Sequence, residues 1–219
     1  MKKEKADIGL AFDGDADRCF LIDEKGDLVN PSALTALIAA RELKSKPGST
    51  IIYNLISSKA VAEVIAENGG VALRSRVGHS YIKSLMAESG AIFGGEHSGH
   101  FYFADFWRAD SGMLAALYAL AELMESSKPL SNLLQPYNRY FSSGEINSKV
   151  KDVAKSIKAV RAEYQDKYQL DELDGLTVTA DTWWFNLRPS NTEPLLRLNV
   201  EANTEKEMAS ITDTVLALL

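Results

Sequence analysis

The chain has 219 residues, 46% of them hydrophobic and 25% charged, which is long enough to bury the core of one large domain or two modest ones. Its net charge is −6, and its only basic cluster is Lys2, Lys3 and Lys5, so neither nucleic acid nor an anionic membrane is expected as a partner. A single cysteine, Cys19, excludes an internal disulfide. No secretory signal is visible and the longest apolar stretch, 113–121, is too short for a membrane helix. These features predict a cytoplasmic protein.

The first part of the chain alternates strands with helices. Two apolar runs, 8–12 and 19–22, predict a pair of strands around an acidic loop. Apolar residues at helical spacing then predict helices over 33–43, 60–67, 80–89 and 113–124. Strands are predicted over 51–54, 71–73 and 91–93, the last running into two glycines. Such alternation predicts a three-layer α/β/α domain with a mixed, mostly parallel sheet.

The character of the chain changes after residue 126. Ser127-Lys128-Pro129 and Gln135-Pro136-Tyr137 bracket a predicted linker. Beyond it the pattern predicts strands over 144–148, 176–180, 182–187 and 195–201, and helices over 150–164 and from Thr204 to Leu219. This order predicts a small α+β domain with an antiparallel sheet. We therefore divide the chain into residues 1–27, an α/β domain over 28–134 and an α+β domain over 135–219.

The loop Asp13-Gly14-Asp15-Ala16-Asp17-Arg18 lies between the first two predicted strands. Three carboxylates at alternate positions, separated by small residues, suit a hard cation such as Mg²⁺ or Ca²⁺. A plain acidic hairpin turn is the simplest alternative. A calcium helix-loop-helix is another, because Glu24 falls at its twelfth position, but Arg18 stands where that loop needs glycine and the flanks resemble strands. The loop therefore predicts a Mg²⁺ site, with Arg18 beside it to hold a phosphate.

A second polar loop, Gly94-Gly95-Glu96-His97-Ser98-Gly99-His100, follows a predicted buried strand. Two glycines let the backbone approach a ligand at the edge of the sheet. Glu96 and Ser98 can exchange hydrogen bonds with sugar hydroxyls, and His100 can move a hydroxyl proton. A glycine-rich turn with solvated histidines is the alternative. A zinc site built from His79, His97 and His100 is a weaker one, because neither a cysteine pair nor H-E-x-x-H spacing accompanies them.

A third polar loop, Arg188-Pro189-Ser190-Asn191-Thr192-Glu193-Pro194, lies between two predicted strands. A guanidinium fork, hydroxyls and backbone N–H groups in a tight bend are suited to binding phosphate. A plain hairpin loop is the alternative. Cation, hydroxyl and phosphate sites together describe one ligand, a phosphorylated sugar.

These motifs, with V-G-H-S at 77–80, resemble in order and spacing those of the α-D-phosphohexomutases, most of all the bacterial phosphomannomutase/phosphoglucomutase group. The resemblance spans essentially the whole chain. It implies four domains around a cleft: the first carries a phosphoserine, the second the Mg²⁺ loop, the third the sugar loop and the fourth, a smaller α+β domain, the phosphate loop. Residues 1–27 would then be the tail of the second domain. The implied reaction interconverts hexose 1-phosphate and hexose 6-phosphate, of mannose or glucose.

The resemblance also implies a role for each matching residue. Mg²⁺ ligands would be Asp13, Asp15 and Asp17, and Arg18 would lie near the transferring phosphoryl group. Sugar hydroxyls would contact Glu96 and Ser98, while His79 and His100 would transfer protons or stabilise charge. The phosphate that is not transferred would be bound by Arg188, Ser190, Asn191 and Thr192.

The chain departs from the family pattern in two places. No segment resembles the T-A-S-H-N-P loop that carries the phosphoserine, so we expect the C-terminal part of a mutase, inactive without the N-terminal mutase domains. Ile56 stands where relatives often have a basic residue, and nearby Lys59 is a possible substitute. The alternatives are a non-catalytic sugar-phosphate-binding module, a phosphatase with an aspartyl nucleophile, and another specificity such as phosphoglucosamine mutase.

Overall fold

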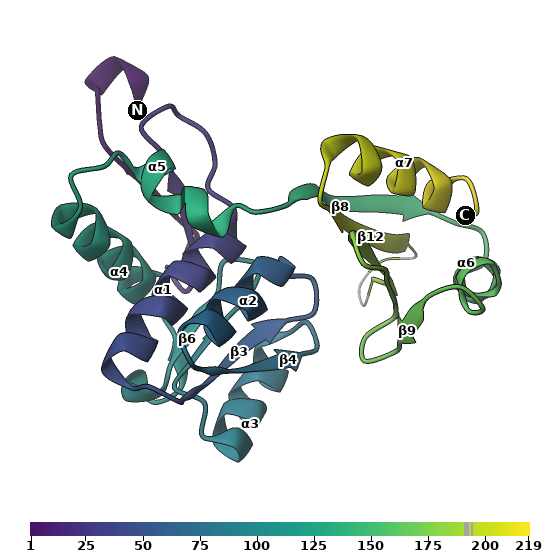
Figure 1. Ribbon diagram of the computed structural model, residues 1–219, viewed down its shortest axis with the longest axis horizontal. Coiled ribbons are helices and arrows are strands. Elements are labelled where there is room, and N and C mark those ends of the chain that lie inside the picture. Colours follow the sequence, from purple (N-terminus) through teal and green to yellow (C-terminus); the bar gives the residue numbers. More distant parts are fainter. Residues whose placement is uncertain (191–192, 194) are drawn as a thin grey trace. The chain divides into compact units, whose positions relative to one another are not determined.

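The structure, a computed structural model, describes residues 1–190, 193 and 195–219 (Figure 1). It divides into two units, residues 1–139 and 140–219, which are described one at a time. The assignment of 1–27, 28–134 and 135–219 to three separate domains stays a prediction.

The central sheet of the first unit has the strand order β4-β3-β5-β6-β7. Its strands are β3 (Thr50–Asn54), β4 (Val71–Ser75), β5 (Phe93–Gly95), β6 (Phe101–Phe103) and β7 (Ala109–Asp110). The β3 strand is parallel to β4 and β5, whereas the β5-β6 and β6-β7 pairs are antiparallel. The sheet is therefore mixed, as predicted. The sequence did not predict β6 and β7, because strands of three and two residues are too short to show alternation.

Helices cover both faces of this sheet. They are α1 (Pro31–Ser45), α2 (Lys59–Glu67), α3 (His79–Ser89), α4 (Gly112–Glu125) and the short α5 (Leu130–Leu134). Ile51 belongs to the apolar cluster of α1, α2 and α4, while its neighbour Ile52 packs with Ile82 and Met86 of α3. Successive strand residues point to opposite faces, so the predicted three-layer α/β/α arrangement is confirmed (Figure 1).

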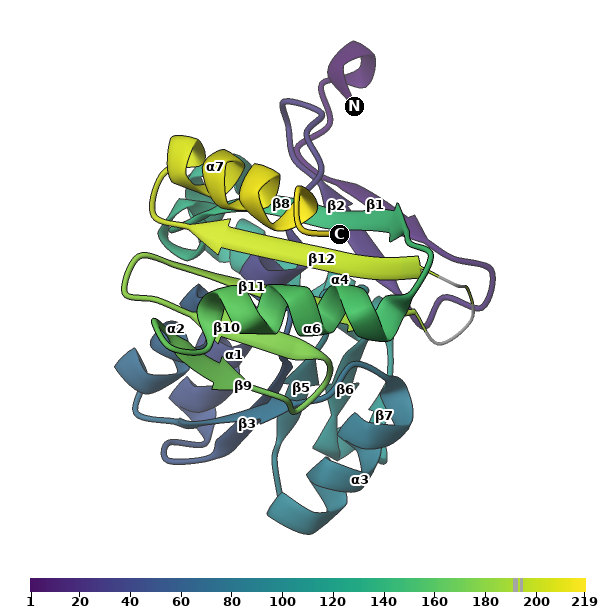
Figure 2. The ribbon, with the colours of Figure 1, turned by 90° about the vertical axis from the view of Figure 1, so that its right-hand side faces the viewer.

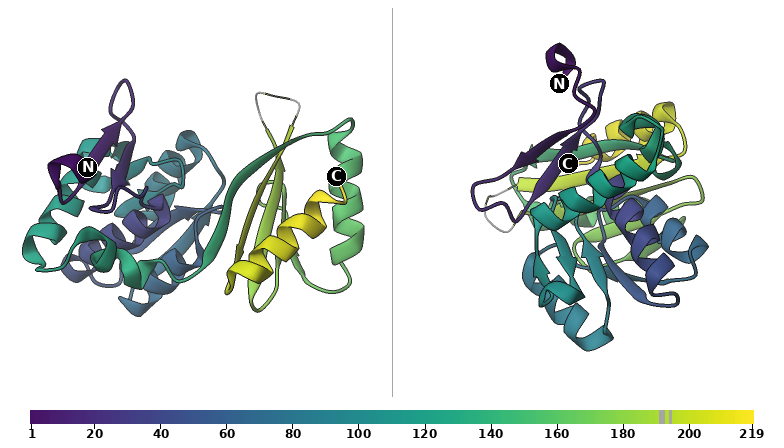
Figure 3. Two further views of the ribbon diagram at one scale, coloured as in Figure 1. Left: turned by 90° about the horizontal axis from the view of Figure 1, so that it is seen from above. Right: turned by 90° about the vertical axis from the view of Figure 1, so that its left-hand side faces the viewer.

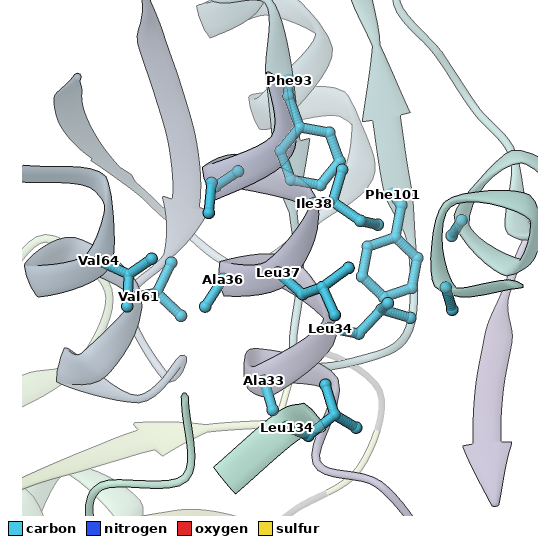
Figure 4. Close-up of a cluster of buried hydrophobic side chains, with 14 of the residues drawn as sticks. Ala33, Leu34, Ala36, Leu37, Ile38, Val61, Val64, Phe93, Phe101 and Leu134 are labelled. Carbon is cyan, nitrogen blue, oxygen red and sulfur yellow. The ribbon is translucent and has the colours of Figure 1, made fainter. Parts of the chain in front are cut away.

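Helix α1 is the centre of the larger cluster. Its Leu34, Leu37 and Ile38 are at most 2% exposed, and Figure 4 shows them between Val61 of α2 and Phe101 of β6. Each such side chain contributes about 1.5–3 kcal/mol by leaving water. Asn30 caps the helix, because its side chain accepts a hydrogen bond from the Ser32 amide at 2.9 Å.

The two glycines of β5 serve the packing of helices. A Cβ on Gly95 would lie 2.4 Å from the side chain of Thr35 in α1, and one on Gly94 would lie 3.1 Å from Ile82 in α3. A larger residue at either position would push a helix away from the sheet. These glycines were predicted to let the backbone approach a ligand, but the structure accounts for them by the contacts of α1 and α3.

The N-terminal hairpin is formed by β1 (Gly9–Phe12) and β2 (Cys19–Ile22), which pair in antiparallel fashion after a short 3₁₀ helix, η1 (Lys2–Glu4) (Figure 3). Cys19 and Leu21 of β2 are buried in the larger cluster. Burial raises the pKa of the Cys19 thiol to about 11, so it behaves as a small apolar side chain rather than a nucleophile. The predicted strand pair is confirmed.

The predicted linker belongs to the first unit. Leu130 and Leu134 of α5 are buried in its core, and the 3₁₀ helix η3 (Gln135–Tyr137) follows directly. Arg139 then forms ion pairs with Glu63 and Glu67 of α2, at 3.0 and 2.6 Å. The linker prediction was wrong because proline and serine suggested a loop, whereas tertiary burial of two leucines stabilises a short helix.

The second unit is an antiparallel sheet with the strand order β8-β12-β11-β10-β9. Its elements are β8 (Phe141–Lys149), α6 (Val153–Tyr164), β9 (Gln169–Asp171), β10 (Leu176–Thr179), β11 (Trp183–Pro189), β12 (Leu195–Ala202) and α7 (Glu205–Leu216). Leu187 and Leu198 pack on one face with Val160 of α6 and Val215 of α7, and Figure 2 shows both helices in front of that face. The α+β prediction is confirmed.

At the start of α7, Thr204 and Glu207 have the spacing of a capping box, of which only half is formed. The Thr204 hydroxyl accepts a hydrogen bond from the Glu207 amide at 3.2 Å. The Glu207 carboxylate accepts its bond from the hydroxyl of Thr182 instead, at 2.6 Å. In the described part of the chain no helix combines the length and apolarity needed to cross a membrane.

Candidate functional site

The acidic loop connects β1 to β2 and bends at Ala16. This residue has a left-handed backbone, with φ of 60°, which costs an L-amino acid about 1 kcal/mol, and its amide donates to the Asp13 carbonyl at 3.3 Å. A Cβ on Gly14 would meet nothing within 4 Å. The bend that gathers the carboxylates therefore depends on Ala16, and not on conformational freedom at Gly14.

The carboxylates of Asp13, Asp15 and Asp17 fit a hard cation, since they offer three ligand oxygens within 4.8 Å of one another. One buried oxygen of Asp17 has no hydrogen-bond partner. Burial raises the pKa of Asp17, the carboxylates of Asp15 and Asp13 raise it further, and His100 opposes them. An oxygen-liganded cation such as Mg²⁺ would compensate this concentration of negative charge.

Arg18 supplies part of that compensation. Its Nε donates to Asp13 Oδ2 at 2.6 Å, and its backbone amide donates to Asp13 Oδ1 at 3.2 Å. Burial would raise the pKa of Asp13, but these hydrogen bonds from Arg18 outweigh it and hold the pKa below its ordinary value. Both carboxylate oxygens of Asp13 are thus in contact with Arg18.

The acidic loop and the loop at 96–100 are joined. Arg18 and His100 form an isolated antiparallel bridge, and the Cys19 amide donates to the Gly99 carbonyl at 3.0 Å. His100 Nε2 lies 3.6 Å from Asp17 Oδ2, and His100 Nδ1 lies 2.9 Å from the Ser98 hydroxyl. The structure therefore brings the predicted residues Asp17, Arg18, Ser98 and His100 into one cluster.

Glu96 is also in this cluster but is only 2% exposed. Its Oε2 accepts a hydrogen bond from the Tyr102 hydroxyl at 2.7 Å, and its Oε1 accepts from the Gly78 amide at 3.1 Å. The loops that begin after Asn54 of β3, after β4 and after β5 all start at the carboxyl ends of parallel strands, where open α/β sheets bind ligands.

His79 begins α3 directly after Gly78, so its backbone lies beside the Glu96 contact, while the residue itself is exposed. Ile56 is buried at 7% exposure and offers the site no charge. Among the described residues, the clusters able to hold a metal are Asp13, Asp15 and Asp17, and Asp17, His100 and Asp110. Neither includes His79 or His97, so the structure gives no support to the three-histidine zinc alternative.

The calcium helix-loop-helix alternative is likewise excluded by the local structure. The acidic loop is flanked by the strands of a hairpin. The carboxylate of Glu24, the residue at the twelfth position, accepts hydrogen bonds from the amide and hydroxyl of Ser131 at 3.1 and 2.6 Å.

Sequence reasoning missed Gly112, which begins α4. A Cβ at this position would lie 2.5 Å from the carbonyl oxygen of Arg18 and 3.0 Å from that of Ala16. Only glycine allows the start of α4, capped by Ser111, to pack against the backbone of the acidic loop. A glycine immediately after a helix cap was the one available signal.

Lys83 and Asp110 were missed as well. Lys83 Nζ lies 2.8 Å from Asp110 Oδ1. Burial would raise the pKa of Asp110, but the hydrogen bond and charge of Lys83 keep it below the ordinary value. The pair places one more carboxylate beside His100, because ligand atoms of Asp17, His100 and Asp110 lie within 4.8 Å of one another. It joins residues of α3 and β7, and no local sequence pattern links these two segments.

In the second unit, Arg188 is part of β11 rather than of a loop, and its side chain is 5% exposed. Arg197 of β12 is its direct cross-strand partner. Glu145 of β8 lies between them, with Oε2 2.9 Å from Arg188 Nη2 and Oε1 3.6 Å from Arg197 Nε. Burial lowers the pKa of Arg188 and the charge of Glu145 opposes this. Arg188 Nε is buried without a hydrogen-bond partner, so it has a donor left for an anion.

Ser190 comes directly after Pro189, the last residue of β11, and its hydroxyl accepts a hydrogen bond from Arg197 Nη2 at 3.3 Å. The sequence predicted Arg188 and Ser190 together but gave no indication of Arg197 or Glu145. The other two predicted phosphate ligands, Asn191 and Thr192, lie outside the described residues.

The first unit is a mixed α/β/α domain with acidic and polar loops at one edge of its sheet. The second is an antiparallel α+β domain. The protein is therefore of the class that joins an α/β/α domain to a small α+β domain. Residues 30–140 match the profile of the phosphoglucomutase/phosphomannomutase alpha/beta/alpha domain III, and residues 145–218 match that of the C-terminal domain of the same family. The chain belongs to the phosphoglucomutase/phosphomannomutase family.

Among individual relatives, the phosphomannomutase of Methanocaldococcus jannaschii is 45% identical over 95% of this chain and 46% of its own length. A phosphoglucomutase/phosphomannomutase family protein of Burkholderia thailandensis shares the fold with a TM-score of 0.88 and 32% identity, over the whole chain and 47% of that protein. The chain thus spans about half the length of these relatives.

A more distant solved structure, the N-acetylphosphoglucosamine mutase of Aspergillus fumigatus in complex with GlcNAc-6P and magnesium, has a TM-score of 0.72 and 14% identity over 95% of this chain and 48% of that protein. This likeness shows the fold alone.

Proposed function

We propose that the chain carries the magnesium, sugar and phosphate loops of a phosphomannomutase/phosphoglucomutase, which interconverts hexose 1-phosphate and hexose 6-phosphate by Mg²⁺-dependent phosphoryl transfer. The observation that carries the proposal is the joining of two loops with complementary chemistry. The Cys19 amide and Gly99 carbonyl, 3.0 Å apart, tie a three-carboxylate loop to a loop of hydroxyl and imidazole groups at one edge of the sheet.

In this proposal each residue of the cluster has one task. Asp13, Asp15 and Asp17 hold Mg²⁺, which when bound neutralises charge on the phosphoryl group. Arg18 leaves part of its contact with Asp13 to meet the transferring phosphoryl oxygens. Proximity and electrostatic stabilisation dominate phosphoryl transfer. The acidic loop therefore contributes to the reaction by holding Arg18 in place, and it forms no covalent bond to the substrate.

The second loop would handle the sugar. Ser98 and Glu96 bind hydroxyls. His100 contacts the Ser98 hydroxyl through Nδ1 and Asp17 through Nε2, at 2.9 and 3.6 Å, so its ring can hold a proton between a hydroxyl and a carboxylate. His79, exposed at the start of α3, contributes a second imidazole for charge stabilisation.

The second unit would bind the phosphate that stays on the sugar. Arg188 keeps a free Nε donor, and Arg197 lies opposite it on the neighbouring strand. Ser190, Asn191 and Thr192 complete the proposed cradle. A phosphate that enters it competes with Glu145 for the guanidinium groups.

We place the phosphoserine outside this chain, because no segment resembles its loop. Exchange requires a nucleophile that keeps the phosphate between half-reactions, whereas binding requires only the loops that are present. The chain by itself is therefore proposed to bind hexose phosphates without mutase activity. Its partners would be mannose or glucose phosphates and the N-terminal mutase domains.

The test is an NMR titration of the ¹⁵N-labelled chain with glucose 6-phosphate, mannose 6-phosphate and glucosamine 6-phosphate, each compared with the free sugar and with inorganic phosphate. We expect the phosphorylated sugars to bind more tightly than the free sugars. Arg188→Lys should weaken binding although it keeps the charge, because the planar fork is lost. Arg161→Lys on α6 is the matched control. Equal affinity for sugar and sugar phosphate, or no effect of Arg188→Lys, would contradict the proposal.

A further inference from the structure

Glu96 is a buried carboxylate held by three parts of the first unit. The Tyr102 hydroxyl donates to Oε2 at 2.7 Å, the Gly78 amide donates to Oε1 at 3.1 Å, and Asn54 Nδ2 lies 3.5 Å from the same Oε1. A carboxylate that is 2% exposed is tolerated only where hydrogen bonds replace its hydration. The donors come from β6, from the loop before α3 and from the end of β3, so one side chain ties these segments together.

Of the three donors, Tyr102 makes the shortest contact, and its side chain is fixed. It is 0% exposed and packs in the apolar cluster with Ile52, Ile82 and Met86. Burial raises the pKa of Tyr102 and the charge of Glu96 raises it further, so the phenol keeps its proton and stays a donor.

The phenol ring also adjoins two other side chains of the site. It stacks on the ring of His100, with centroids 6.3 Å apart and planes 25° apart, and Lys83 Nζ lies 5.8 Å from its centroid. The neighbours of the ring in its own cluster, Ile52, Ile82 and Met86, are all apolar. Phenylalanine at 102 would pack against them equally well, so the hydroxyl is explained by its bond to Glu96.

We propose that Tyr102 is a positioning residue for the sugar site. Its hydroxyl fixes the Glu96 carboxylate in the orientation that also accepts the Gly78 amide, and thereby sets the loop that leads into His79. The part that concerns sugar rests on the proposed function, since it requires Glu96 to meet sugar hydroxyls. The part that concerns Glu96 and Gly78 is independent of any ligand.

The first experiment uses the full chain without ligand. Hydrogen exchange of the Gly78 amide is measured by NMR in the wild type, in Tyr102→Phe and in Tyr118→Phe. The control removes a phenol hydroxyl that also donates to a glutamate, Glu42, on the opposite face of the sheet, where Tyr118 stacks on Phe103. Without the hydrogen bond from Tyr102 the Glu96 carboxylate is no longer fixed as the acceptor of the Gly78 amide, so we expect Gly78 exchange to rise about ten-fold in Tyr102→Phe only. Unchanged exchange, or an equal rise in the control, overturns the proposal.

The second experiment is a double-mutant cycle on glucose 6-phosphate binding with Tyr102→Phe, Glu96→Gln and the double variant. If Tyr102 acts through Glu96, its removal weakens sugar-phosphate binding about ten-fold in the wild type and has little further effect in Glu96→Gln, while affinity for inorganic phosphate is unchanged. Additive losses, or an equal loss for inorganic phosphate, refute the positioning role. If no variant binds sugar phosphate although Gly78 responds as expected, the proposed function fails and the structural part of the inference stands.

Discussion

Replacing Glu145 by glutamine should strengthen the binding of inorganic phosphate to the second unit. The carboxylate lies between Arg188 and Arg197, where an incoming phosphate would have to share the guanidinium groups with it. Glutamine keeps a carbonyl oxygen that can accept from Arg188 Nη2, so the substitution removes the negative charge and preserves the contact.

The magnitude follows from the position of Glu145. Two unit negative charges roughly 6 Å apart repel by about 3 kcal/mol at an effective dielectric constant of 20. The Glu145 side chain is 28% exposed, so solvent screening reduces this to about 1 kcal/mol, and affinity should rise about five-fold. The same variant should lose stability, by about 1–3 kcal/mol, because buried Arg188 loses part of its counter-charge.

Phosphate affinity would be measured by NMR titration at fixed ionic strength, and stability by urea unfolding. Glu163→Gln is the matched control, since it removes one negative charge from α6 at a surface pair with Lys167. Weaker phosphate binding by a folded Glu145→Gln variant would refute the reasoning. It would show that Glu145 orients the arginines for the anion rather than competing with it.

Three further outcomes are expected in the first unit. Asp15→Asn should abolish Mg²⁺ binding seen by calorimetry, because it removes one of three clustered ligands; equal affinity in the variant would contradict the metal site. Gly112→Ala should weaken Mg²⁺ binding, because the added Cβ would lie 2.5 Å from the carbonyl oxygen of Arg18 and displace the loop backbone. Gly14→Ala should leave the fold intact, because its Cβ would have open space around it. Because the pKa of Asp110 lies below its ordinary 3.8, its pair with Lys83 stabilises above that pH and the contribution is lost as pH falls through the lower, folded value. The Tm difference between wild type and Lys83→Met should therefore shrink in acid, and a difference that grows there would exclude this ion pair.

The sequence predicted most of the larger elements because their signals are local. Asn30, Pro31 and the apolar residues after them predict helix α1, and its cap is formed as expected. The strands of the second unit alternate between apolar residues facing α6 and α7 and polar residues such as Arg188 and Arg197. The acidic loop could be located because three aspartates at alternate positions indicate a cation site without any knowledge of the fold.

The residues that were not predicted depend on tertiary contacts. Glu145 contacts Arg188 across 43 positions of sequence. Tyr102 is near Glu96 in the sequence, but its hydroxyl reaches the carboxylate only when β6 pairs with β5. For Gly94 and Gly95 a local pattern led to a wrong interpretation. Their sequence context suggested a ligand, but glycine is required there because helices approach the strand from both faces of the sheet.

The most direct test of the account is a coupled assay of glucose 1-phosphate conversion to glucose 6-phosphate, with Mg²⁺ and a trace of glucose 1,6-bisphosphate. It would be run with the chain alone, and with the separately expressed N-terminal half of the Methanocaldococcus jannaschii phosphomannomutase added. We predict no turnover by either part alone, and turnover by the mixture that is lost with Asp15→Asn. Turnover by the chain alone would place a nucleophile within it, and a mixture that is inactive, or that tolerates Asp15→Asn, would contradict the role given to these loops.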